Sequence, residues 1–167
     1  GNQEAATTAL ANVEATYQRR ADLIPNLAKT GQAYAKHERE TMEEVVKARA
    51  AASQVKLDAD NLTPEKMKAF QEAQGQLSQA LGKLMVVVEK YPDLKASENF
   101  RSLQVQLEGT ENRINEARQK YNDAVQTYNK DVRTFPNVIF AGMFGFEKME
   151  KFEAATGAEK APELNFD

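Results

Sequence analysis

The sequence predicts an all-α protein, an antiparallel bundle of three long helices with a fourth, shorter helical element. Two observations support this prediction. Apolar residues recur every seven positions along extended stretches, which is the period of a stripe on helices that pack side by side. The 167 residues also include only 8 glycines and 5 prolines, so the chain has few of the residues that interrupt helices or form tight turns.

The strongest stripe runs along residues 100–135. Every seventh position is apolar or aromatic: Phe100, Leu107, Ile114, Tyr121, Tyr128 and Phe135. A companion row contains Leu103, Ala117 and Ala124, with polar residues at Thr110 and Asp131. A stripe of this length is unfavourable when exposed to water, so the other segments must cover it.

Residues 4–54 are predicted to form one long helix with a weaker stripe, which includes Tyr34 and Val45 and continues in phase on both sides of Pro25. A proline inside a helix leaves one backbone carbonyl, here that of Ala21, without its donor and costs about 3 kcal/mol unless another group replaces it. Because the stripe keeps its phase, we expect a kink near Pro25. A break into two helices is the alternative.

The next helix has a clear start signal. Residues 55–62 are a polar connection, predicted to be solvated, and Thr63 followed by Pro64 is typical of a helix N-terminus. Gln74 is the one polar member of the stripe that follows, and Ser97 is the expected cap of the central helix. The apolar members of the stripe are Met67, Phe70, Leu77, Leu81, Leu84, Val88 and Tyr91.

Residues 138–146 (VIFAGMFGF) are apolar throughout and too few to cross a bilayer. We expect them to fold back and plug the end of the bundle, and the alternative is an exposed patch for a partner or a lipid surface. The candidate patch residues are Val138, Ile139, Phe140, Met143, Phe144 and Phe146. Residues 147–155 are predicted as a short amphipathic helix that completes a single domain, residues 1–155, and residues 156–167 as a loosely ordered tail.

The predicted helix lengths do not match. A helix of about 50 residues is roughly 75 Å long, whereas one of about 27 residues, as predicted after Thr63, is roughly 40 Å long. The first helix is therefore expected to extend well beyond its neighbour. A bend or break at Pro25, a second chain, or continuation into a membrane anchor would account for the excess, and we expect the first and the third to act together.

Composition narrows the classes of function. The formal net charge is −3, whereas nucleic-acid-binding proteins usually carry a basic surface, so we expect no nucleic-acid partner. The lack of cysteine excludes thiol nucleophiles and thiolate metal sites, and the single histidine, His37, excludes a multi-histidine metal site. We identify no catalytic residues, no metal site and no cofactor motif, and an enzyme ranks last among the functions considered.

Three charged residues lie on or beside the apolar stripes. Arg20 lies on the stripe of the first helix, where an unpaired charge is costly. Glu111 and Arg118 are seven residues apart and so lie on one side of the central helix. We expect the three to share a polar network that fixes the register between helices, and a neighbouring guanidinium to satisfy the carbonyl that Pro25 frees. The alternative is a site in which the two arginines hold an anionic ligand.

Several motifs make the sequence similar to the LemA family. They include residues 19–27 (RRADLIPNL), 89–96 (EKYPDLKA), 109–114 (GTENRI) and 121–125 (YNDAV). Leu10 is a departure, because relatives often carry Trp there. The resemblance covers most of the chain. It implies a bundle of four α-helices behind a single N-terminal membrane segment, in a family without an established enzymatic activity.

Pattern and resemblance together predict a non-enzymatic helical interaction or scaffold domain. We expect it to be anchored in a bacterial cell membrane by one N-terminal segment, facing either side, and to bind an unknown protein partner or a second copy of itself. The alternative function is a ligand-binding or sensory domain with an anionic-ligand site near Arg20 and Arg118. Fold-level analogy does not decide between these functions.

Overall fold

The computed structural model describes residues 2–131, and within that range the chain is helical with short connections and no strand. The elements in order are α1 (Asn2–Tyr34), η1 (Lys36–Glu38), α2 (Arg39–Gln54), η2 (Ala59–Asn61), α3 (Pro64–Val88), α4 (Pro92–Ala96) and α5 (Glu98–Asp131), where η denotes a single 3-10 turn. The predicted all-α class is confirmed for these residues. Residues 138–146, the helix predicted over 147–155 and the domain boundary at 155 lie outside the described range.

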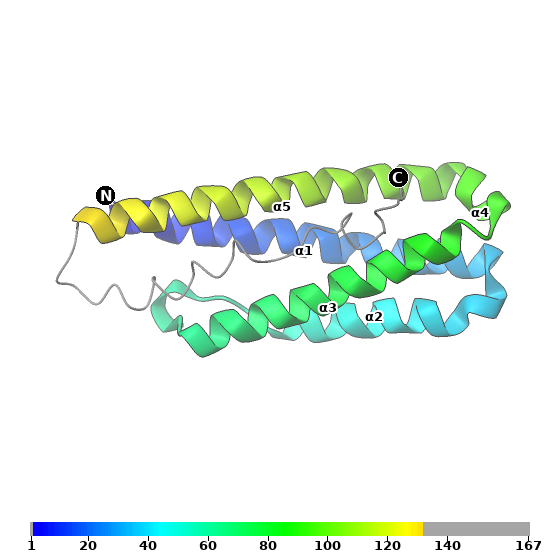
Figure 1. The fold of residues 1–167 in the computed structure, drawn as a ribbon, viewed down its shortest axis with the longest axis horizontal. Coiled ribbons are helices and arrows are strands. Elements are labelled where there is room, and N and C mark those ends of the chain that lie inside the picture. Colours follow the sequence, from blue (N-terminus) through cyan, green and yellow to red (C-terminus); the bar gives the residue numbers. More distant parts are fainter. Residues whose placement is uncertain (1, 132–167) are drawn as a thin grey trace.

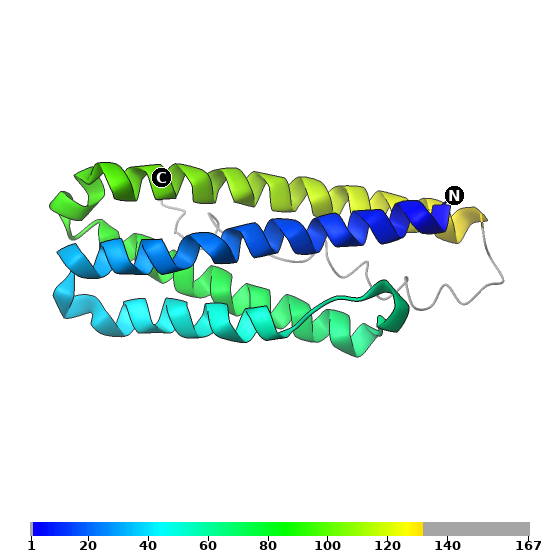
Figure 2. The same cartoon turned by 180° about the vertical axis from the view of Figure 1, so that it is seen from behind.

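Four helices lie lengthwise and alternate in direction (Figures 1 and 2). α1 packs along α5, α2 packs along α3, and α1 also contacts α2. The short α4 connects α3 to α5 at the same end of the bundle as the turn between α1 and α2 (Figure 1). At the other end, the beginning of α1 and the end of α5 project together beyond the connection between α2 and α3 (Figures 1 and 2).

The stripe of the central helix forms the core face of α5. Five of its members are buried: Phe100, Leu107, Ile114, Tyr121 and Tyr128. The sixth, Phe135, lies outside the described residues. Thr110 is also buried, and its hydroxyl donates a hydrogen bond to the Leu107 carbonyl at 2.7 Å, so a polar residue is accommodated within the row. The seven-residue pattern therefore identified both this helix and its buried face.

The prediction of one helix over residues 4–54 is wrong, because the chain reverses direction after α1 and returns as α2 (Figure 2). Ala35 leaves the helical conformation with φ −126° and ψ 62° and is fully buried, whereas the neighbouring Tyr34 is 47% exposed. Gly31 makes room for the end of the buried Met42 side chain at the turn, since a Cβ added there would lie 2.5 Å from Met42 Cε. The stripe looked continuous because the buried residues of the two antiparallel helices follow the same seven-residue spacing across the turn.

α1 continues through Pro25, so the chain does not break there. The Nε of Arg49 on α2 donates to the Ala21 carbonyl at 2.8 Å and replaces the backbone donor that Pro25 lacks. The expected kink at Pro25 stays a prediction. The first helix has 33 residues instead of about 50, so its excess over α3, which has 25 residues, is only about 12 Å, and α5 with 34 residues lies alongside it.

The predicted helix caps are confirmed. Thr63 Oγ1 accepts from the Lys66 N–H at 3.1 Å at the start of α3, and Ser97 Oγ accepts from the Phe100 N–H at 3.3 Å at the start of α5. The connection between α2 and α3 is less solvated than predicted, because Leu57 and Leu62 are both buried. These two side chains close the bundle beneath the projecting ends of α1 and α5.

The apolar core consists of two separate clusters. The first lies toward the N-terminal end of α1 and includes Leu10, Val13, Leu62, Phe70, Ile114, Tyr121 and Val125. The second lies toward the turns and includes Ile24, Leu27, Met42, Leu77, Leu81, Phe100 and Leu107. The residues between the two clusters are polar and buried, and they form the candidate site.

Candidate functional site

A layer of polar residues crosses the bundle between the two apolar clusters. Its buried members come from α1, α3 and α5 and are Arg20, Gln74, Ser78, Thr110, Glu111 and Arg118. On each helix, these polar residues occur on or next to the apolar stripe, at helical spacing from its members. They therefore face the interior of the bundle together with the stripe. We call this set, together with Tyr17, the polar layer.

Arg20 is the centre of the polar layer and is only 2% exposed. Its Nη1 donates to Ser78 Oγ at 3.0 Å and lies 3.5 Å from Glu111 Oε1, an ion-pair distance. Its Nη2 donates to the Gln74 side-chain oxygen at 3.0 Å and to the Gln74 backbone carbonyl at 3.2 Å. One guanidinium on α1 therefore ties together α3 and α5.

Tyr17 connects the polar layer to the first apolar cluster. The guanidinium carbon of Arg20 lies 5.3 Å from the centroid of its ring, and the ring meets Phe70 edge-on at a centroid distance of 5.2 Å and an angle of 82°. Burial raises the pKa of the Tyr17 hydroxyl to about 12, against the opposing effects of the Arg118 and Arg20 charges and of a hydrogen bond from Arg118. Arg118 thus joins the polar layer through Tyr17.

The polar layer contains three charged side chains. Arg20 and Arg118 are cations and Glu111 is an anion, and all three are buried. Burial lowers the pKa of Arg20, opposed by Tyr17 and Glu111, but a guanidinium stays protonated at any ordinary pH. The Arg20 Nε is buried and has no hydrogen-bond acceptor within residues 2–131.

The structure brings Arg20 and Glu111 into direct contact and places Arg118 beside them through Tyr17. Sequence reasoning missed three participants. Gln74 had a signal, as the one polar member of its stripe, whereas Ser78 lies off the stripe and Tyr17 was indistinguishable from an apolar core residue. The guanidinium expected at the Ala21 carbonyl belongs to Arg49 rather than to the polar layer.

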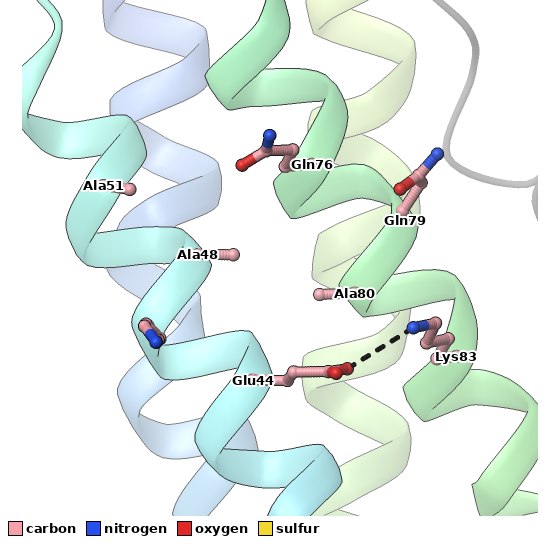
Figure 3. Close-up of a pocket in the computed structure, with 8 residues that line it drawn as sticks. Glu44, Ala48, Ala51, Gln76, Gln79, Ala80 and Lys83 are labelled. Atoms are coloured by element: carbon pink, nitrogen blue, oxygen red, sulfur yellow. Dashed lines mark ion pairs between the residues drawn. The ribbon is translucent and has the colours of Figure 1, made fainter.

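In the described part of the chain, a small pocket borders Tyr17 and Gln74. Its volume of about 30 Å³ is enough to hold a water molecule. Larger hollows occur on the surface. One of about 290 Å³ lies between α2 and α3, floored by Ala48 and Ala80 and bordered by the 3.7 Å ion pair of Glu44 and Lys83 (Figure 3).

A second surface hollow, of about 350 Å³, lies where the end of α1 meets the start of α5. Its lining includes Asn26, Tyr34 and the hydrogen-bonded pair Asn99 and Thr30, whose Nδ2 and Oγ1 are 3.0 Å apart. Across residues 2–131, no three His, Asp or Glu side chains converge as a metal site would require. In the same range, no helix combines the length and apolarity needed to cross a membrane.

The arrangement of residues 2–131, a helical bundle with a charged layer enclosed between two apolar clusters, places the chain among helical-bundle proteins. Within this class the chain belongs to the LemA family, whose family model matches residues 9–166.

The chain is also similar to magnetosome proteins. It is 29% identical over 85 residues to Magnetosome protein MamQ of Magnetospirillum gryphiswaldense, a match covering 51% of this chain and 31% of that protein. It is 36% identical over 86 residues to Magnetosome protein MamQ 2 of Paramagnetospirillum magneticum, covering 52% of this chain and 32% of that protein. The matched region is therefore about a third of the length of these relatives.

Proposed function

We propose that this chain is a non-enzymatic, membrane-anchored helical interaction or scaffold domain of the LemA family. The observation that carries the proposal is the polar layer, in which both terminal nitrogens of Arg20 bond to groups of the chain itself. Polar residues in the core of packed helices fix the register at which helices meet, at some cost in stability. By fixing the positions of the helices relative to one another, the polar layer would give a partner a surface of constant shape.

The position of the N-terminal end supports a membrane anchor. α1 begins at the projecting end of the bundle, so a membrane segment preceding it would hold the bundle end-on (Figure 1). The turns at η1 and α4 would then lie farthest from the membrane, where a protein partner has free access. The similarity to proteins named for the magnetosome agrees with a place in a larger assembly at a bacterial membrane.

Cross-linking and mass spectrometry on the full-length, membrane-embedded protein test this proposal. Lys29, Lys36 and Lys95 lie near the turns, so their cross-links to a partner are expected to exceed those of Lys66 at the opposite end. The control is an unrelated helical bundle carried by the same anchor. A set of cross-linked proteins that does not differ from this control would contradict the scaffold function.

A second candidate function is binding of an anionic ligand near Arg20 and Arg118. It is supported by the burial of both arginines and by the buried Arg20 Nε, which has no acceptor in the described residues. A thermal-shift screen against anionic metabolites tests it. A rise of several degrees in melting temperature that Arg39→Met retains and Arg118→Met abolishes would favour the ligand-binding function over the scaffold.

A further inference from the structure

We propose that the seam between α3 and α5 is the docking site of the chain's own apolar segment, residues 138–146. The inference goes beyond the proposed function because it assigns a surface of the bundle and its occupant. It begins with the packing of the helices. α1 and α5, α1 and α2, and α2 and α3 have closely packed backbones, whereas α3 and α5 approach each other less closely (Figure 1). At the level of the backbone, this side of the bundle is therefore less tightly packed than the sides formed by the other three pairs.

On α3, the flank of this seam is built from small and polar residues. Positions spaced alternately by four and three residues fall on one face of the helix, and on this flank they are Gln71, Gly75, Ser78, Gly82 and Met85. A Cβ added to Gly75 would meet no atom within 4 Å, so there is free space beside that backbone. A side chain of a further segment can thus lie beside the Gly75 backbone without displacing an atom.

On α5, the facing residues are long and polar. They are Gln104, Glu111, Arg118 and Asn122, again at helical spacing on one face. Gln104 Nε2 lies 3.9 Å from Met85 Sδ, which shows that this face of α5 is turned toward α3. The seam consequently has a hydrogen-bonding side on α5 and an uncrowded side on α3.

Within residues 2–131, one amide atom of each of two seam residues lacks a hydrogen-bond partner. The Nε2 of Gln71 and the Oδ1 of Asn122 are both buried, and neither has a hydrogen-bond partner in the part of the chain that the structure describes. Buried amide groups are nearly always satisfied in folded proteins. One is a donor and the other an acceptor, and a peptide backbone laid along the seam supplies both a carbonyl and an N–H group.

The length of the chain beyond α5 identifies the occupant. α5 runs about 30 Å from the level of Glu111 to its end at Asp131. A chain that turns back at about 3.3 Å per residue covers this distance in about nine residues, which brings residues 140–143 to the level of Gly75. Nine consecutive apolar residues must also be covered from water, and their backbone can satisfy the two amides while their side chains fill the space beside Gly75.

Disulfide trapping in the full chain tests the proposal, because the sequence contains no cysteine. Gly75→Cys is combined in turn with a cysteine at Ala141, Gly142 or Met143. The matched control is Gly109→Cys, which likewise has free space around its Cβ and lies near the same level of the bundle, but away from the seam face of α5. Under mild oxidation, at least one Gly75 pair is expected to form an intramolecular disulfide in at least about tenfold higher yield than its Gly109 counterpart.

Equal yields for the two series, or no intramolecular disulfide with Gly75→Cys, would overturn the proposal. Disulfide-linked dimers in place of intramolecular bonds would identify a second copy of the chain as the occupant and would overturn it as well. A second measurement uses the full chain without cysteines. Phe140→Asp is expected to raise amide hydrogen exchange at the seam, in residues 71–85 and 115–122, but not in α2. Unchanged exchange at the seam, accompanied by loss of binding to phosphatidylcholine vesicles, would identify a lipid surface as the target instead.

Discussion

Replacing Arg20 by Met tests the polar layer directly. Methionine keeps an unbranched apolar stem of similar reach but no guanidinium. Glu111 then loses a cation 3.5 Å away, while Gln74 and Ser78 lose the donor to their oxygens. Because all of these groups are buried, water cannot replace the lost hydrogen bonds without opening the bundle.

The expected loss of stability follows from this geometry. Two unit charges 3.5 Å apart attract by about 5 kcal/mol at an effective dielectric constant of about 20, before the unfavourable desolvation of both ions is subtracted. The variant recovers the desolvation of Arg20 only, since the Glu111 carboxylate remains buried. Breaking a buried pair on one side typically costs about 3–5 kcal/mol. In a domain of this size, that loss lowers the melting temperature by about 10–15 °C.

Thermal unfolding followed by far-ultraviolet circular dichroism measures this change. Arg39→Met is the matched control, because it removes an ion pair with Glu43 whose two side chains are 74% and 65% exposed. An exposed pair contributes little, so this control is expected to leave the melting temperature within about 2 °C. Glu111→Gln, alone and with Arg20→Met, completes a double-mutant cycle with an expected coupling of about 1–3 kcal/mol. A melting temperature for Arg20→Met equal to that of the control would refute the structural role of the polar layer.

Three further changes test other features. Arg49→Met is expected to destabilise the protein by about 2 kcal/mol. In a protein that also carries Pro25→Ala, which restores the missing backbone N–H, the same change is expected to cost far less. Urea unfolding measures the stability of both variants, and additive effects would contradict the idea that Arg49 replaces the donor that Pro25 lacks. Gly109→Ala is expected to stabilise the protein by about 0.5–1 kcal/mol, because the added Cβ meets no other atom. Gly31→Ala is expected to give no gain, because its Cβ would lie 2.5 Å from the Met42 side chain. Equal shifts in melting temperature for the two variants would argue against this crowding at Gly31. Burial raises the pKa of Tyr17 from 10.0 to about 12, so its contribution is intact below pH 10 and is lost as the pH rises toward 12. That loss is about 3 kcal/mol, and Tyr17→Phe should therefore lose stability less steeply over this interval; a parallel decline in urea unfolding would count against it.

The sequence by itself determined which residues face the core and where most helices begin. The seven-residue period of residues 100–135 identified α5 because its large apolar residues recur on one face, as the burial of Phe100, Leu107, Ile114, Tyr121 and Tyr128 shows. Thr63 and Ser97 marked helix starts because capping is a local interaction between residues three positions apart. The charge of Arg20 on an apolar stripe was enough to predict that it needs partners, and in the structure Glu111 Oε1 lies 3.5 Å from its Nη1.

Only the tertiary structure decided the direction of the chain after α1 and the remaining partners of the polar layer. Periodicity states that a face is buried, but it does not state against which helix, so α1 and α2 looked continuous although Ala35 separates two antiparallel helices. The donor that compensates Pro25 is Arg49, which comes from a different helix. Ser78, which accepts a hydrogen bond from Arg20, likewise comes from a different helix than Arg20. Such contacts depend on how helices cross in space, and crossing is set by side-chain packing between segments far apart in the chain rather than by the period within any one of them.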